Sequence, residues 1–283
     1  MEEPSPASQI VEKGTMMKGL VSIGAVLILW TATLAAGPVE VHIGGGPSAA
    51  SLDEINAAIT LFNALIERLN ETFEELPDVE GSVETLGRMG SCIALQVGER
   101  FLLTEHLTLG GTLDMSHTSA STAGTYLSTV STETSDISIA LTCTDVGLVV
   151  GGRYDFLNAG LILSADVGIG YYYGIFRQAI TFQVPPEFPD AIAGLPPEGE
   201  NRYSGFAPAV EAGLVLSFPL TDWFKVGSSV SYRFLTFTGM TDGQGNSIDL
   251  DGNGIPEKID LGGITVELTF SILIDFSLEG RKE

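Results

Sequence analysis

The feature that most constrains this chain is a two-residue alternation of apolar and polar side chains, repeated over most of its length. The segment GITVELTFSILIDFSL, residues 263–278, shows it most clearly, because its even positions are all Ile, Val, Leu or Phe. Its odd positions include Thr, Glu, Ser and Asp. Side chains alternate between the two faces of a β-strand, so the pattern predicts a strand with one apolar and one polar face.

The same pattern predicts eight strands. The alternation in 137–154 changes phase near Cys143, which we interpret as a β-bulge or as an extension beyond the main sheet. The predicted strands are 39–43, 93–103, 107–115, 137–154, 161–175, 206–218, 224–234 and 263–278.

The connections between these strands alternate in length, which predicts that every long loop emerges at one end. The short connections are 104–106, 155–158 and 219–222, and the long ones are 44–89, 116–136, 181–204 and 239–260. Aromatic residues gather at the short-turn end, as in an interfacial girdle: Phe101, Tyr154, Phe156, Phe218, Trp223, Phe224 and Phe276.

Sorted loops, an even strand count and strands of about 10 residues are typical of outer-membrane barrels. A soluble β-sandwich or lipocalin-like barrel also alternates, but its apolar face points inward and no rule sorts its loops. We therefore predict an all-β membrane protein, a closed antiparallel up-and-down barrel of about 8 strands.

On this topology, between Val39 and Leu278, the chain resembles the small eight-stranded bacterial outer-membrane barrels, which include the OmpA membrane domain and OmpW-like proteins. The resemblance implies assembly by the barrel insertion machinery, short turns in the periplasm and long loops outside the cell. Members of this group usually end on an aromatic residue. This chain differs, because SLEGRKE follows Phe276. Ten strands are the alternative to eight.

The first residues predict export. Lys18 precedes the apolar run 19–30, and small residues follow, which is typical of a signal peptide cleaved after Ala35 or Ala36. An uncleaved anchor is the alternative, although the run is shorter than the ~20 residues of a spanning helix. The predicted parts are an upstream extension (1–15), a signal peptide (16–36) and a barrel (37–283) with a helical insertion (51–76).

The composition argues against nucleic acid as a partner. The formal net charge is −23, with 36 acidic and 13 basic residues, whereas phosphate binding requires clustered Lys and Arg. Cys92 and Cys143 could be oxidised in an exported protein. We expect two buried thiols, with a disulfide as the alternative.

If the apolar face meets lipid, the polar face lines the lumen. Eight strands leave space for little more than side chains, so we expect an ion-pair network there. Inward glycines could instead leave a cavity or a narrow conduit: Gly98, Gly110, Gly168, Gly170, Gly174, Gly213 and Gly227. The predicted network is Glu40, Arg100, Asp114, Asp145, Arg153, Asp166, Glu211, Lys225, Arg233, Glu267 and Asp275.

The segment DLDGNGIPEKID, residues 249–260, has the ligand spacing of a calcium loop, with glycine at its sixth position for the sharp turn. It resembles the calcium repeats of thrombospondin type 3. A polar loop without metal is the alternative. The candidate ligands are Asp249, Asp251, Asn253, Ile255 through its carbonyl, Glu257 and Asp260.

The segment SLDEINAAITLFNALIERLNETFEEL, residues 51–76, is the one helical pattern after the leader. Ser51 and Glu54 suggest a capping box. We expect this helix at the external mouth of the barrel, partly inserted as a plug or lid; the membrane interface or another chain could instead cover it. Its apolar stripe is Leu52, Ile55, Ile59, Phe62, Ile66, Leu69 and Phe73.

Two functions fit these features. The first is a non-catalytic structural or surface-interaction barrel, and the second is a gated passage or binding barrel for small or apolar molecules. A lipid-modifying enzyme that uses His117 is a weaker alternative, because His117 lies in a Ser- and Thr-rich segment where a neighbouring hydroxyl is expected by chance. We therefore predict no enzyme and no cofactor other than calcium.

Overall fold

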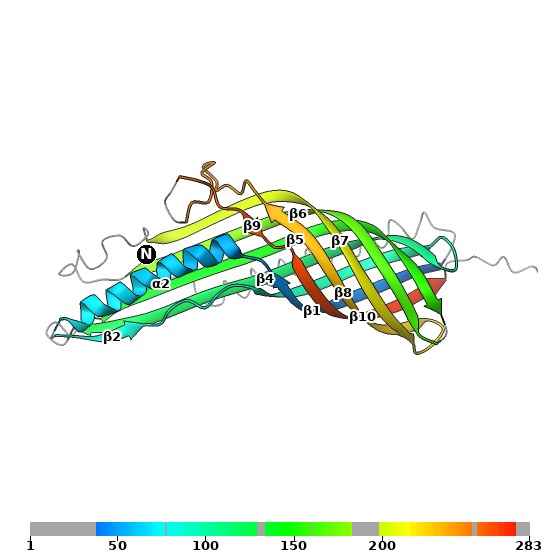
Figure 1. Ribbon diagram of the computed structural model, residues 1–283, viewed down its shortest axis with the longest axis horizontal. Coiled ribbons are helices and arrows are strands. Elements are labelled where there is room, and N and C mark those ends of the chain that lie inside the picture. Colours follow the sequence, from blue (N-terminus) through cyan, green and yellow to red (C-terminus); the bar gives the residue numbers. More distant parts are fainter. Residues whose placement is uncertain are drawn as a thin grey trace, which may run out of the picture.

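The computed structural model describes residues 38–76, 78–128, 134–158, 160–182, 198–250 and 254–275. The predicted leader and the end of the last predicted strand lie outside these residues. Eight strands form a closed antiparallel barrel with one helix between its first two strands, which confirms the predicted fold (Figure 1). No helix in the described part of the chain is long and apolar enough to cross a membrane.

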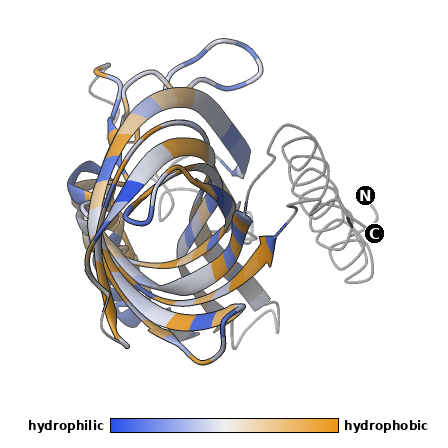
Figure 2. Ribbon diagram, turned by 90° about the vertical axis from the view of Figure 1, so that its right-hand side faces the viewer, coloured by the Kyte–Doolittle hydropathy of each residue, from blue (hydrophilic) through white to orange (hydrophobic). Residues whose placement is uncertain are grey.

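Each barrel strand pairs with the next one along the chain, and the ring closes because β10 pairs with both β1 and β8 (Figure 2). Two short strands, β2 and β9, pair with β4 and β8. The bounds are β1 Pro38–Ala50, α2 Asp53–Glu74, β2 Val79–Val83, β3 Ser91–Leu102, β4 Leu107–Ser128, β5 Thr134–Asn158, β6 Ile162–Phe182, β7 Gly199–Pro219, β8 Phe224–Phe237, β9 Ile259–Asp260 and β10 Gly263–Asp275.

Four neighbouring strands, β4 to β7, are longer than predicted and continue beyond the ring (Figure 1). The segment 116–136, predicted as a loop, is strand as far as Ser128, and the predicted loop 181–204 is strand again from Gly199. Most residues that face inward there on β4 are small or β-branched, such as Thr118 and Thr122. Tyr126 is the large exception, and its ring contacts Phe73 of α2. We call these strand ends, together with α2 and β2, the extension.

Strand β5 passes through both parts without a break. Its pairing with β4 and β6 is continuous from 137 to 154, so the phase change near Cys143 marks the extension and not a bulge. On one side of this point Ile139 and Leu141 face inward and are buried. On the other side Leu148 and Val150 face outward and are 45% and 51% exposed. The apolar face therefore changes from inside to outside while the register stays constant.

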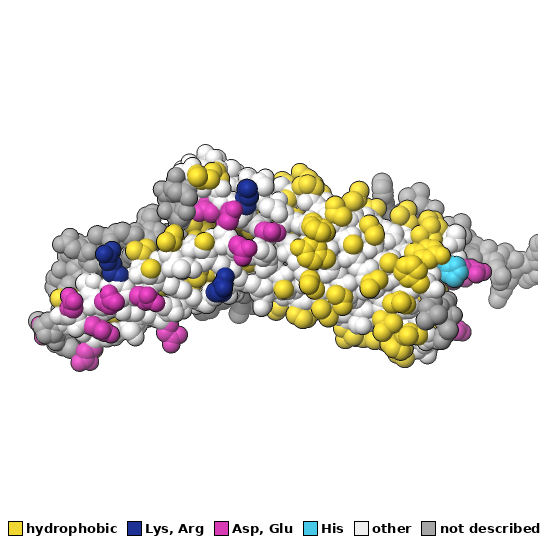
Figure 3. Space-filling model, viewed as in Figure 1, with side chains coloured by type: hydrophobic (Ala, Val, Ile, Leu, Met, Phe, Trp, Pro, Cys, Tyr) yellow, Lys and Arg dark blue, Asp and Glu magenta, His cyan; other side chains and the backbone are white. Residues whose placement is uncertain are grey.

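The outward face of the ring is an apolar band, whereas Asp and Glu gather over the extension (Figure 3). Aromatic side chains border the band on both sides: Tyr154, Phe156, Phe218 and Trp223 at the short-turn end, and Tyr171, Phe206, Tyr232 and Phe234 near the extension. Phe206 and Phe218 are twelve residues apart on β7, or about 30 Å across the band at ~3.3 Å per residue and a ~40° tilt. Such a band is typical of a transmembrane β-barrel.

The helix α2 lies along the inner face of the extension and not inside the ring, so the expected partial insertion does not occur (Figure 1). All residues of its predicted apolar stripe are buried, and they share one core with Tyr126, Ile139 and Phe176. The expected capping box is absent. Ser51 bonds to the Asp53 carboxylate, and the Glu54 carboxylate accepts the backbone N–H of Lys258.

Three asparagines attach α2 to the extended segment 83–89. They are seven residues apart, a helical rise of about 10.5 Å, and their partners are three residues apart, about 9–10 Å of extended chain. The two repeats therefore match. Each side-chain amide both donates to and accepts from one backbone position at 2.6–3.0 Å: Asn56 with Met89, Asn63 with Leu86 and Asn70 with Val83.

A tyrosine adds a further contact to this row of asparagine contacts. The Tyr126 hydroxyl donates to the Asn70 side-chain oxygen. Burial raises the pKa of Tyr126 to about 12, so the phenol remains protonated and able to donate at neutral pH.

We predict that Asn63→Ala destabilises the extension by about 1–3 kcal/mol, because it removes both partners of a backbone position. Hydrogen exchange at Leu86 and limited proteolysis of segment 83–89 should both become faster. Glu67→Ala, an exposed change on the same helix, should leave both unchanged. Equal hydrogen exchange in the two variants would show that the asparagine contacts do not hold the segment 83–89 in place.

Candidate functional site

The polar side chains of the lumen form two groups along the barrel axis. The turn-end cluster lies near the short turns, and the extension-end cluster lies near the extension. The turn-end cluster is Glu40, His42, Arg100, Arg153, Asp166 and Lys225. The extension-end cluster is Asp114, Ser116, Asp145, Tyr172, Glu211 and Arg233.

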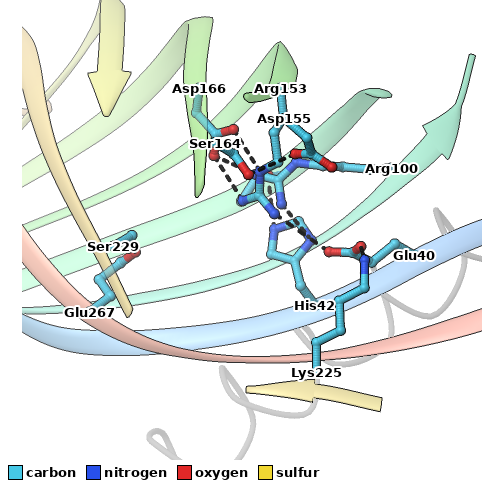
Figure 4. Close-up of polar contacts among 11 residues, drawn as sticks. Glu40, His42, Arg100, Arg153, Asp155, Ser164, Asp166, Lys225, Ser229 and Glu267 are labelled. Carbon is cyan, nitrogen blue, oxygen red and sulfur yellow. Dashed lines mark hydrogen bonds and ion pairs between the residues drawn. The ribbon is translucent and has the colours of Figure 1, made fainter. Parts of the chain in front are cut away.

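Arg153 is the centre of the turn-end cluster (Figure 4). It binds both oxygens of Asp166, with Nε–Oδ1 and Nη2–Oδ2 distances of 2.7 and 2.9 Å. Such a two-bond pair fixes the planar guanidinium in orientation as well as position. Arg100 also reaches Asp166 at 3.2 Å, and Glu40 accepts from Lys225 at 2.8 Å and lies 3.5 Å from Arg153. The cluster draws on five different strands, and its Arg153–Glu40 and Arg100–Asp166 contacts join strands that are not neighbours and so cross the lumen.

Arg233 is the centre of the extension-end cluster. Its guanidinium binds Asp145 at 3.1 Å and Asp114 at 3.0 Å, and it also donates to Ser116. Asp145 is completely buried, so Arg233 supplies the positive charge that a buried carboxylate requires. The ring of Tyr172 lies 5.0 Å from the guanidinium, and its hydroxyl donates to Asp114 at 2.8 Å.

The structure thus brings most of the predicted lumen residues into contact. Glu267 accepts its hydrogen bonds from the neutral side chains Gln96 and Ser229 and not from a cation. Asp275 is exposed at the last position of β10. His42, Ser116 and Tyr172 belong to the clusters but were not predicted, since the predicted network contained charged residues alone. Their inward positions followed from the same two-residue period.

Between the clusters lies a cavity of about 80 Å³. It is bordered by Arg153 and Asp166 on one side and by Arg233 and Glu211 on the other. At roughly 10–15 Å³ of such volume per water molecule, it has room for about five to eight waters. Glycines among the predicted set line it, namely Gly110, Gly168 and Gly213. The inward glycines therefore border a cavity, but the two clusters and their contacts lie at both of its ends.

The candidate calcium loop is described in part. Asp251 and Asn253 lie outside the described residues. Gly254 has a φ of +78°, as the sharp turn requires, and its N–H donates to Asp249 at 3.0 Å. Glu257 accepts from the N–H of Leu250, and Asp260 from that of Gly262. In the described residues, no group of three or more His, Cys, Asp or Glu side chains has the arrangement of a metal site.

Both cysteines are buried thiols, as expected. Cys143 lies opposite Thr118 on β4, and Cys92 lies on β3, on the other side of β4. Two strand spacings separate their backbones by about 10 Å, which exceeds the ~7 Å limit for a disulfide.

We predict that Arg233→Met lowers the stability of the barrel by about 3–5 kcal/mol, because it leaves the buried Asp145 without a positive charge. The unfolding midpoint in urea, followed by the loss of the compact band in unheated gel samples, measures the change. Arg233→Met with Asp145→Leu should be more stable than Arg233→Met alone. A single variant as stable as the wild type would contradict the assigned role of this contact.

No family model and no curated protein matches the chain. Solved structures of outer-membrane proteins are similar in fold. A major outer membrane protein of Thermus thermophilus is 10% identical over 85% of this chain and all of its own, with a TM-score of 0.43. Ail, the attachment invasion locus protein of Yersinia pestis, solved in complex with the heparin analogue sucrose octasulfate, is 12% identical. The match covers 84% of this chain and 99% of Ail, with a TM-score of 0.36.

Neisserial surface protein A is 6% identical over 84% of this chain and 97% of its own, with a TM-score of 0.38. Identity and TM-score are low for all three proteins.

Proposed function

We propose that this chain is an integral outer-membrane protein with a structural or surface-interaction role. Its short turns lie in the periplasm, and the extension projects from the cell and caps the external mouth. The barrel insertion machinery and membrane lipid are its proposed partners. The observation that carries the proposal is a lumen crossed by ion pairs at both ends beneath a folded, helix-covered extension.

The closed lumen favours this role over a gated passage. At one end the contacts of Arg153 with Glu40 and of Arg100 with Asp166 cross the lumen. At the other end the aromatic rings of Tyr172 and Phe237 are fully buried in the core that also holds α2. A permeant molecule would have to break buried ion pairs and an apolar core in succession.

The extension itself is built as a surface and not as a set of flexible loops. Its strands present Ser119 and Ser121 on the outward side, and its inner side is a continuous apolar core. The exposed face of α2 is acidic, with Glu67, Glu71 and Glu74. The extension therefore has a polar outer surface of fixed shape, which suits contact with molecules outside the cell.

We predict that the wild type shows no single-channel openings in planar bilayers. The triple variant Asn56→Ala, Asn63→Ala, Asn70→Ala, which loosens the attachment of α2, should also be silent, because the ion pairs of the lumen remain. Openings in the triple variant alone would instead support the helix as a gate. Openings in both proteins would support a passage without a gate.

A catalytic role for His117 is not part of this proposal. His117 lies on the outward face and contacts Thr144 at 2.8 Å. Unchanged lipid turnover after His117→Ala would agree with a non-catalytic barrel, whereas its loss would favour the lipid-modifying alternative.

We propose in addition that the loop 249–260 binds calcium outside the cell. The positive φ of Gly254 and its bond to Asp249 support a turn of the required shape. Calcium at millimolar concentration would be sufficient for a weak extracellular site.

We predict that calcium slows proteolysis of this loop in the wild type and that Asp251→Ala abolishes the effect, because a calcium ligand is lost. Isothermal titration with calcium chloride measures the binding directly. Magnesium at the same concentration is the control for a general ionic effect. Equal protection of both proteins by calcium would eliminate the proposed site.

A further inference from the structure

Two arginines lie directly opposite each other on the outward face of the extension. The register between β6 and β7 pairs Arg177 with Arg202, and both are exposed. Like charges directly opposite on neighbouring strands repel. In the described part of the chain, no ion pair includes either guanidinium. With only 13 basic residues against 36 acidic ones, two unneutralised arginines at adjacent positions indicate an anionic ligand.

The strand registers place hydroxyl side chains in the same row. Thr142 on β5 is opposite Arg177, and Ser119 on β4 is opposite Thr142. The next row toward the ring contains His117 and Thr144. Guanidinium, hydroxyl and imidazole groups all donate hydrogen bonds to phosphate oxygens. Four neighbouring strands thus present one row of donors with two positive charges.

The row lies just beyond the apolar band. Phe206 is opposite Tyr173 and stacks on Tyr171 with 5.6 Å between ring centroids. Arg177 is four residues beyond Tyr173 on β6, which is about 10 Å along the membrane normal. A headgroup layer is ~5–8 Å thick, and arginine side chains can bend toward it. The guanidinium groups therefore reach the headgroups while the aromatic rings remain at the level of the acyl chains.

The carboxylate beside this row does not cancel its charge. Glu200 lies on the same face, two residues from Arg202, and opposite Ala179. Among the paired positions of β6 and β7 around Arg177 and Arg202, Glu200 is the one carboxylate, so these rows stay net positive on a surface that is mostly acidic. The row therefore attracts an anion that the rest of the extension repels.

We infer that this row binds the phosphate of an outer-leaflet membrane lipid whose acyl chains lie against Tyr171, Tyr173 and Phe206. The inference rests on the proposed function, because it requires the extension to be on the external side. A lipid is favoured over free phosphate because the donor row and the exposed aromatic rings are continuous on one face.

The test compares the full-length wild type with Arg177→Gln/Arg202→Gln in detergent by native mass spectrometry. The probes are diphosphoryl lipid A and phosphatidylethanolamine. We expect the wild type to bind one diphosphoryl lipid A and the variant to bind it at least roughly tenfold more weakly. Equal binding of lipid A by both proteins would overturn the inference. The substitution should not destabilise the barrel, since it removes a repulsion.

A matched control is Arg68→Gln/Arg88→Gln, which removes one exposed arginine from α2 and one from the segment 83–89 and should leave lipid A binding unchanged. Arg177→Lys/Arg202→Lys keeps the charge and should retain most of the binding. If inorganic pyrophosphate displaces lipid A at equal concentration, the site recognises a free anion and the lipid assignment is wrong.

Protease treatment of intact cells separates this inference from the proposed function. If the extension is cleaved from outside but the wild type and Arg177→Gln/Arg202→Gln bind lipid A equally, the lipid site alone is refuted. If the extension is protected because it lies in the periplasm, the proposed orientation is refuted, and the outer-leaflet site with it.

Discussion

Backbone N–H and C=O groups at membrane depth must be bonded within the protein, because hydrocarbon offers them no partner. The ring meets this requirement through the pairing of β10 with β1 and β8. Beyond the band, water can satisfy free strand edges, so β4 to β7 can continue where the other strands end. The ladder between β7 and β8 stops at Ala209 and Leu235, and Pro208, which has no N–H to donate, is the next residue. Strand length is therefore unequal only where the solvent permits it.

The alternation in the sequence predicted the ring because lipid imposes a strong contrast between the two faces. It failed where that contrast is weak. In 116–128 the inward Thr118 and Thr122 alternate with the outward Ser119 and Ser121, so both faces have small hydroxyl side chains and no polarity difference marks the strand. Most inward residues there are small because the segment 83–89 lies above them, as the bond from the Thr122 hydroxyl to the Glu84 carbonyl shows. This tertiary requirement cannot be inferred from 116–128 alone. The same applies to the contacts of Asn56, Asn63 and Asn70 with the segment 83–89. The seven-residue spacing of the asparagines predicts nothing until it is compared with the three-residue spacing of their partners.

The two-residue alternation assigned charged residues to the lumen, but it could not predict which of these side chains contact each other. Arg233 on β8 meets Asp145 on β5 and Asp114 on β4, contacts that depend on how the closed sheet is tilted and staggered. Hydrogen-bond registers between adjacent strands are local, whereas contacts across the lumen depend on all eight registers together. This is why the faces were predictable and the two clusters were not.

Steric packing of aromatic rings against glycines also closes the extension end of the lumen, in addition to the ion pairs of Arg233. Gly147 lies directly opposite Tyr172, and a Cβ atom at Gly147 would come within 2.3 Å of the Tyr172 ring. A Cβ atom at Gly174 would come within 2.7 Å of the ring of Phe237. The inward glycines thus have two roles: some border the cavity between the two clusters, whereas these two accept aromatic rings. Because both rings belong to the core beneath α2, opening the lumen would require repacking of the extension, which links the closed state of the barrel to the stability of its external surface.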